Sequence, residues 1–173
     1  MITILTDQAT NSLGQTLYQK LAKTGQNIKL FCMDDLHVEP CYACRGCEEK
    51  TYGRCVIRDD ADLILPCLVR SETIIVLTSI VFGGYSFPIK RIVDRFALLV
   101  DQHYSYRKGE LVKGAKERFP RTQYYVIGIH DGADPEEVQA FRQLVMETIQ
   151  IAAWAGRSFA LSHDALIRKV AES

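Results

Sequence analysis

The sequence predicts an α/β protein built on a doubly wound parallel sheet, because two kinds of segment alternate along the chain. Short runs of apolar and β-branched residues alternate along the chain with longer stretches of helical periodicity. Each connection between neighbouring parallel strands requires a crossover, which is usually a helix. The 173 residues contain no internal repeat, low-complexity tract or linker, so we expect a single domain over residues 1–173.

Five runs of residues have the composition of buried strands. The run at residues 73–77, TIIVL, is the clearest, because it is almost continuously apolar and rich in β-branched side chains. The predicted strands cover residues 2–5, 27–31, 73–77, 124–129 and 158–161.

Apolar residues at helical spacing predict helices between these strands. In the first helix, Leu13, Leu17 and Leu21 recur every four residues. The pair Asp59-Asp60 can cap a second helix that continues to about Arg70. A third helix carries one apolar stripe, made of Ile89, Ile92, Val93, Phe96, Leu99 and Val100.

The fourth helix has a strong start signal, with Asp134 as the cap, Pro135 in the first position and Glu137 three residues after the cap. We expect it to end near Gly156, and a last helix to begin at Asp164. Two doubly wound strand orders are compatible with this pattern. The first turn lacks the G-x-G-x-x-G motif of the dinucleotide-binding order. This favours a flavodoxin-like five-stranded parallel sheet of order 2-1-3-4-5, with helices on both faces.

The composition limits the classes of partner. The 21 basic residues balance the 21 acidic residues, which argues against a nucleic-acid partner. The N-terminus has no basic segment typical of a signal peptide, and no apolar run approaches the roughly 20 residues that cross a bilayer. We therefore expect a cytoplasmic protein without a membrane partner. In that compartment, the six cysteines are expected to be thiols, metal ligands or redox groups.

In open parallel sheets, ligands bind at the carboxyl ends of the strands. The segment after the first strand is rich in hydroxyl and amide side chains and leads into a helix N-terminus, which can hold a phosphate. The candidate phosphate ligands are Asn11, Ser12, Gln15 and Thr16. The alternative is that Asn11 or Ser12 only caps the helix.

The segments after the third and fourth strands suit a flat heteroaromatic ring. Glycines allow close approach of the backbone, and Phe82 and Tyr85 offer stacking surfaces. The candidate ring-binding residues are Ser79, Ile80, Val81, Phe82, Gly83 and Gly84, followed by His130, Asp131 and Gly132 after the fourth strand. An ordinary Gly-Gly turn and a polar turn before a helix remain the alternatives.

Four cysteines lie in the long irregular stretch between residues 32 and 58. Cys41, Cys44 and Cys47 have the C-x2-C-x2-C spacing by which iron–sulfur clusters are bound, and Cys55 follows. Structural zinc is less favoured, because it usually pairs two separated C-x2-C motifs. The alternative is a set of reduced thiols that shape a loop. We interpret Cys32 and Cys67, outside this segment, as packing residues.

Together these motifs resemble those of the flavodoxin-like NAD(P)H-dependent FMN reductases, which include the iron-sulfur flavoproteins. The resemblance rests on the four cysteines, on Asp59-Asp60, on the segment Ser79 to Gly84 and on Lys90 to Arg95. It implies FMN at the strand ends with the four-cysteine segment beside it, NAD(P)H as hydride donor, and possible ligation of a [4Fe–4S] cluster by the cysteines. It also implies a homodimer or higher homo-oligomer.

This chain departs from the family pattern at two places. Thr6-Asp7-Gln8-Ala9 replaces the usual Gly-Ser-Pro-Arg, which places an acidic residue near the expected phosphate. Ile80-Val81-Phe82 replaces Pro-Val-Tyr. Three functions are therefore considered: an FMN-dependent NAD(P)H oxidoreductase acting on a quinone, free flavin or other electrophile; an iron–sulfur electron carrier for a redox protein; and a relative that has lost FMN.

No residue is identified from the sequence as an essential proton donor. The candidates for this role are Tyr85, His103, Tyr104 and His130.

Overall fold

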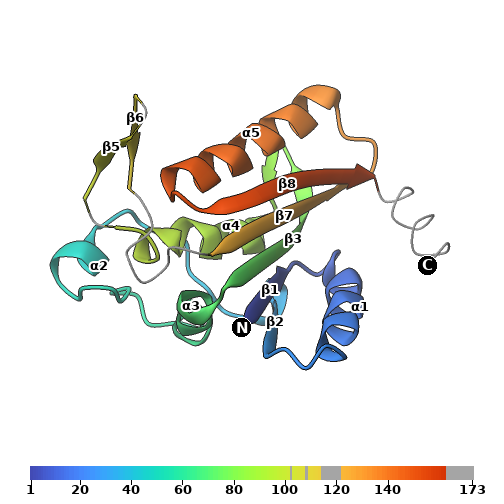
Figure 1. The fold of residues 1–173 in the computed structure, drawn as a ribbon, viewed down its shortest axis with the longest axis horizontal. Coiled ribbons are helices and arrows are strands. Elements are labelled where there is room, and N and C mark those ends of the chain that lie inside the picture. The colour runs from blue at the N-terminus through green and yellow to red at the C-terminus, as the bar shows by residue number, and fades with distance from the viewer. Residues whose placement is uncertain (102, 108, 114–121, 163–173) are drawn as a thin grey trace.

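The computed structural model describes residues 1–101, 103–107, 109–113 and 122–162 (Figure 1). The parallel strands of the central sheet are β2 (Ile28–Cys32), β1 (Ile2–Thr6), β3 (Thr73–Val81), β7 (Gln123–His130) and β8 (Ala155–Ser162), in the spatial order β2-β1-β3-β7-β8. This order confirms the predicted flavodoxin-like arrangement. Both β3 and β8 are longer than the sequence predicts.

Helices cover both faces of the sheet, as predicted. One face carries α1 (Asn11–Ala22), and the other carries α3 (Ala61–Arg70), α4 (Phe87–Val93) and α5 (Pro135–Ile151) (Figure 1). Leu13, Leu17 and Leu21 of α1 pack against Ile4 and Leu77 of the sheet. The larger of the two cores lies on the opposite face, between the sheet and the other three helices.

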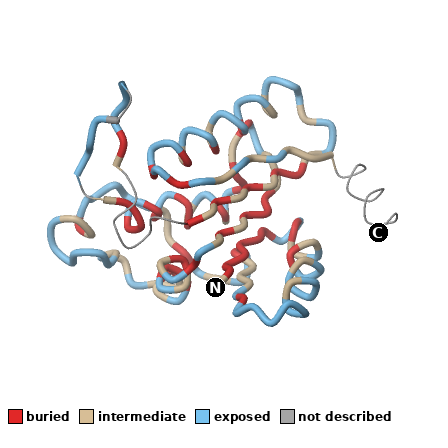
Figure 2. Tube along the Cα trace, viewed as in Figure 1, coloured by how far each residue is buried: buried red, intermediate tan, exposed pale blue. Residues whose placement is uncertain are grey.

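The strands are apolar on both sides because they separate these two cores. In β3, Ile74 and Val76 belong to the larger core, whereas Ile75 and Leu77 pack toward α1. Successive side chains of a strand point to opposite faces, so a strand covered on both faces has a continuous apolar run. The buried segments in Figure 2 accordingly follow the central strands.

Helix α5 begins where the sequence predicts, because Oδ1 of Asp134 accepts a hydrogen bond from the backbone N–H of Glu136 at 2.9 Å. Its predicted end near Gly156 is wrong, since the helix ends at Ile151 and Gly156 lies in β8. A Cβ atom at Gly156 would lie 1.9 Å from the carbonyl oxygen of Tyr124. The glycine therefore permits close approach of two strands and does not end the helix.

The sequence does not predict the short elements. These are η1 (Met33–Asp35), α2 (Gly46–Glu49), β4 (Gly84–Tyr85), η2 (Asp94–Leu98), β5 (Ser105–Arg107) and β6 (Glu110–Val112). The predicted third helix divides into α4 and η2, and the predicted last helix from Asp164 lies outside the described residues. Among the described helices, none has the length and apolar character required to cross a membrane.

Candidate functional site

Asp7 connects two of the three segments that the sequence analysis assigned to ligand binding. It follows β1 directly, and its Oδ2 accepts a hydrogen bond of 2.7 Å from the backbone N–H of Ser79 in β3. Its Oδ1 accepts from the backbone N–H of Thr10 at 2.9 Å and lies 2.8 Å from the Thr10 hydroxyl. Asp7 is only 4% exposed. Its carboxylate therefore points into the protein and holds the first loop against β3.

The charge of Asp7 is stabilised in this position. Burial alone would raise the pKa of its carboxyl group, but hydrogen bonds from Ser79, Ser86 and Thr10 outweigh burial, so that the pKa lies below its ordinary value of 3.8. The carboxylate is therefore ionised at neutral pH, and the surrounding donors stabilise its charge. The acidic residue that departs from the family pattern is thus part of the loop's framework.

The predicted phosphate ligands lie in the first two turns of α1. The helix cap is Thr10, which makes no side-chain capping bond, so Asn11 and Ser12 are helical residues and not caps. The carboxamide oxygen of Asn11 accepts from the hydroxyl of Thr6 at 3.2 Å. Ser12, Gln15 and Thr16 are exposed, and the Thr16 hydroxyl donates to the carbonyl of Ser12.

This donor set fits a phosphate group. The first turn of a helix presents backbone N–H groups without helical acceptors and carries the positive end of the helix dipole. Hydroxyl and amide side chains at Asn11 and Ser12 add further donors.

The predicted ring-binding segment after β3 is a β-hairpin and not an irregular loop. Ile80 pairs with Tyr85 and Val81 with Gly84, so Ser79, Ile80 and Val81 belong to β3. The turn residues Phe82 and Gly83 have φ angles of 48° and 71°, which is the pattern of a type I′ turn.

The two aromatic residues of this hairpin have different environments. Phe82 is 93% exposed at the tip, where it can stack on a flat ligand. Tyr85 is 6% exposed and packs edge-to-face on Phe141, with ring centroids 5.8 Å apart. The prediction that Tyr85 is a stacking surface is therefore wrong, because its ring is part of the core.

The segment after β7 forms a tight polar turn. His130 is the half-buried last residue of β7, and its Nδ1 accepts a hydrogen bond from the backbone N–H of Ala133 at 3.3 Å. Asp131 and Gly132 are exposed at the turn. The structure therefore places all three predicted segments at the carboxyl edge of the sheet.

Of the four candidate proton donors, His130 and Tyr85 lie in segments at this edge, but the side chain of Tyr85 is buried in the core. Burial raises the pKa of the Tyr85 phenol, whose hydroxyl lies 3.3 Å from that of Tyr124 inside the core. His103 and Tyr104 are exposed residues just before β5, outside the three predicted segments.

The four-cysteine segment lies away from the carboxyl edge. Helix α5 ends just before β8 starts, so its C-terminus marks the amino edge of the sheet. There the backbone N–H of Lys113 donates to the carbonyl of Ile151, while Nζ of Lys113 pairs with Glu48 of α2 at 2.8 Å. Figure 1 shows α2 on one side of the molecule and the start of α1 on the other. Within one chain, the cysteine segment therefore lies apart from the three segments predicted to bind the flavin.

The described arrangement of the cysteines does not fit a metal cluster. Cys41 and Cys44 are exposed, whereas Cys47 and Cys55 are half-buried against the larger core. Burial raises the pKa of the Cys47 thiol, which favours its protonated form. Within the part of the chain that the structure describes, no group of three or more Cys, His, Asp or Glu side chains is placed to hold a metal ion.

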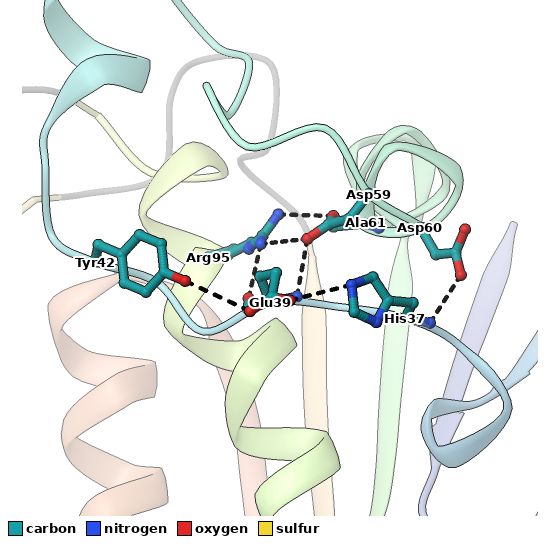
Figure 3. A network of polar contacts seen from close by, with 7 residues as sticks. All are labelled: His37, Glu39, Tyr42, Asp59, Asp60, Ala61 and Arg95. Atoms are coloured by element: carbon teal, nitrogen blue, oxygen red, sulfur yellow. Dashed lines mark hydrogen bonds and ion pairs between the residues drawn. The ribbon is translucent and has the colours of Figure 1, made fainter.

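Arg95 and Asp59 hold both ends of the four-cysteine segment (Figure 3). Nη1 and Nη2 of Arg95 donate to Asp59 at 3.0 and 2.6 Å, and the two side chains are 1% and 2% exposed. Nη2 also donates to the carbonyl of Glu39, whose own N–H donates to Asp59. Asp60 accepts from the backbone N–H of His37 at 2.8 Å.

This pair accounts for two of the family motifs. Burial would raise the pKa of Asp59, but the hydrogen bonds from Arg95 and from the N–H groups of Glu39 and Ala61 lower it. Asp59 therefore holds the segment as well as the start of α3. The sequence analysis missed this role, although an arginine beside the apolar stripe of the third predicted helix was a signal.

Comparisons with known proteins agree with this architecture. No family model matches the chain. An iron-sulfur flavoprotein of Methanocaldococcus jannaschii is 33% identical over 75 residues, which are 43% of this chain and 38% of that protein. An iron-sulfur flavoprotein of Archaeoglobus fulgidus is 29% identical over 99 residues, which are 57% and 49% of the two chains. The matches thus span half or less of the length of these relatives.

Solved structures with similar folds cover nearly the whole chain. An NAD(P)H:quinone oxidoreductase from Methanothermobacter marburgensis has a TM-score of 0.65 at 9% identity, over 94% of this chain and 86% of its own. An FMN-dependent NADH-azoreductase from Bacillus anthracis, solved with FMN, has a TM-score of 0.59 at 12% identity, over 95% and 88%. The chain has the flavodoxin-like fold.

The flavodoxin-like fold explains why the three predicted segments meet. Its strand order reverses between β1 and β3, and ligands bind outside the carboxyl ends of the strands at that switch point. The hydrogen bond between Asp7 and Ser79 joins these two strand ends. The resemblance to flavodoxin-like FMN reductases and iron-sulfur flavoproteins, inferred from the motifs, is confirmed by the comparisons.

Proposed function

We propose that this chain is an FMN-dependent NAD(P)H oxidoreductase that reduces a small molecule, such as a quinone, a free flavin or another electrophile. The observation that carries the proposal is the Asp7–Ser79 hydrogen bond at the switch point. It fixes the first loop so that the uncapped start of α1 and the end of β3 belong to one site. Ligands of flavodoxin-like sheets bind at this position.

In this proposal the start of α1 holds the FMN phosphate. The backbone N–H groups of the first turn and the side chains of Asn11 and Ser12 donate to the phosphate oxygens. Gln15 and Thr16 lie one turn further along the exposed side of α1 and complete the predicted set. Because Asp7 is turned inward and accepts hydrogen bonds from Thr10 and Ser79, its carboxylate would hold the loop and not compete for the donors of the phosphate.

The β3–β4 hairpin and the His130 turn would hold the flavin ring. Phe82 offers a stacking surface, and the backbone of residues 79–84 and 130–132 offers N–H and carbonyl groups to the ring's polar edge. When bound, FMN would accept hydride from NAD(P)H and pass the electrons to the acceptor. The residues of this chain would bind and orient the cofactor and the two substrates.

Titration of the apo-protein with FMN tests the proposal directly. We expect saturable quenching of flavin fluorescence, and we expect Phe82→Ala to weaken FMN binding by about tenfold through loss of one stacking surface. Tyr106→Ala is the matched control, because Tyr106 is 73% exposed but lies in β5, away from the carboxyl edge. The absence of saturable quenching at micromolar protein would exclude a flavin-dependent function.

A second candidate is an iron–sulfur electron carrier that acts with a redox protein. The names of the two iron-sulfur flavoprotein relatives favour it, while the described placement of the cysteines does not. Anaerobic purification followed by iron and sulfide analysis separates the two candidates. A protein that contains no iron or sulfide after this procedure would eliminate the carrier.

The assembly and location of the protein stay predictions. We propose that residues 1–173 act as one domain, that the chain forms a homodimer or higher homo-oligomer, and that it works in the cytoplasm. Sedimentation of the purified chain measures the oligomeric state.

A further inference from the structure

A cavity of about 370 Å³ lies on the face of the sheet that α4 and α5 cover, and none of the residues of the proposed flavin site lines it. Its walls come from Tyr85 of β4, from α4 and η2, from the second half of α5 and from residues next to β5 and β6. The volume falls near the lower end of the range, roughly 300 to 1,000 Å³, that is typical of small-molecule sites.

Aromatic and aliphatic side chains form most of the cavity wall. Phe96 and Trp154 contact each other with ring centroids 5.9 Å apart, and Leu144 and Val100 also line the cavity. Such a wall removes apolar ligand surface from water and suits a flat ring.

The charged residues at the cavity are already paired. Lys90 forms an ion pair with Asp94, and Lys113 pairs with Glu48 at 2.8 Å while lying 5.2 Å from the ring centre of Tyr104. A charged ligand would have to break one of these pairs or be buried without a partner, which is costly. The cavity therefore favours an uncharged ligand.

Three hydroxyl-bearing side chains line the cavity, those of Tyr85, Tyr104 and Thr148, and the Thr148 hydroxyl defines the polar part of the ligand. The hydroxyl of Thr148 donates to the carbonyl of Leu144 at 2.9 Å, so toward the cavity it can only accept a hydrogen bond. The Tyr85 hydroxyl hydrogen-bonds to that of Tyr124 and also interacts with the Thr148 side chain, which still has a second lone pair for a ligand. An acceptor beside an apolar wall is complementary to a ligand that carries an O–H group.

We propose that this cavity is a second binding site, which takes an uncharged aromatic molecule of one or two rings with a phenolic hydroxyl. The hydroxyl donates to Thr148, and the ring packs between Phe96, Trp154 and the apolar side of α5. Because none of the residues of the proposed flavin site lines the cavity, the ligand does not occupy that site in the same chain. The proposal does not depend on flavin binding.

The sole tryptophan of the chain makes the site measurable, because it lines the cavity. In a ¹H–¹⁵N NMR spectrum of the apo-protein, 1-naphthol should shift the single indole N–H signal of Trp154 in a saturable way. Naphthalene, which lacks the hydroxyl, should bind about tenfold more weakly. Thr148→Val, which removes the acceptor and keeps the shape, should reduce the affinity for 1-naphthol to that for naphthalene.

A second pair of variants controls for effects on folding. Ala97 is exposed at the cavity, so Ala97→Phe should obstruct the cavity without disturbing the core, and should abolish the shift. Ala22→Phe, at the exposed end of α1, should leave the shift unchanged.

Four results would overturn the proposal. The first two are the absence of a saturable shift of the Trp154 signal and an equal affinity for 1-naphthol and naphthalene. The third is competitive displacement of 1-naphthol by FMN. The fourth is self-association of the chain that Ala97→Phe disrupts, while 1-naphthol causes no shift. The last result would show that a second copy of the chain covers this surface. A failure of FMN binding with an intact 1-naphthol shift would refute only the proposed function.

Discussion

Electrostatics and loop geometry predict opposite effects on FMN affinity when the buried carboxylate of Asp7 is neutralised. Asp7→Asn keeps the shape of the side chain but replaces one acceptor oxygen with a donor. Asp7 accepts backbone hydrogen bonds from Thr10 and Ser79, so in the variant one of these buried N–H groups faces another donor. A simple repulsion between the carboxylate and a phosphate would make the variant bind FMN more tightly.

The structure predicts the contrary result. A hydrogen bond to a charged group contributes about 1.5–3 kcal/mol, and an unpaired buried donor costs about 1–3 kcal/mol. Because these two effects partly overlap, we expect the free energy of unfolding to fall by about 2–4 kcal/mol. The loosened first loop should then weaken FMN binding, because the phosphate donors at the start of α1 are no longer held against β3.

Urea unfolding and FMN fluorescence titration measure these two effects. Glu72→Gln is the control, since the Glu72 side chain is exposed directly before β3, away from the carboxyl edge, and its effect on stability should stay within about 0.5 kcal/mol. An Asp7→Asn variant that is as stable as the control, or that binds FMN more tightly than the unsubstituted protein, would refute the framework role of Asp7.

Three further predictions concern the stability of the fold. The pKa values of Asp7 and Asp59 are lowered from 3.8 in the folded protein. The stability that these carboxylates contribute is therefore present above pH 3.8 and is lost as the pH falls through their lowered pKa values. In an acid titration, the free energy of unfolding of Asp7→Asn should fall less steeply than that of the unsubstituted protein. Arg95→Met should lower the free energy of unfolding by about 3–5 kcal/mol, because Asp59 is then buried without its partner. A loss below about 1 kcal/mol in urea unfolding would contradict the role of Arg95 in holding Asp59. Gly156→Ala should lower the free energy of unfolding by about 3 kcal/mol, because the new Cβ lies 1.9 Å from a backbone oxygen of β7. Gly84→Ala is the control, because its Cβ makes only an ordinary contact at 3.5 Å. Equal thermal midpoints for the two variants would show that the strands can separate to make room.

The local parts of this fold could be predicted from the sequence because their causes are local. The apolar runs of the five parallel strands and the repeat of Leu13, Leu17 and Leu21 follow from residues close together in the chain. The Asp134 cap also acts within three residues of its position. The flavodoxin-like order followed from this alternation and from the motif that the first turn lacks.

The tertiary structure alone decided which residues meet across long sequence separations. The bond from Asp7 to Ser79 spans 72 positions, and the pair of Arg95 and Asp59 spans 36, so no local pattern indicates either. From the sequence alone, an acidic residue in a predicted phosphate loop is expected to repel the phosphate. Only the direction of its side chain in the structure shows that it holds the loop. Similarly, the cysteine spacing indicates a possible cluster, but burial and the direction of the loop decide whether four thiols converge. Side-chain direction depends on packing between distant elements, which periodicity does not specify.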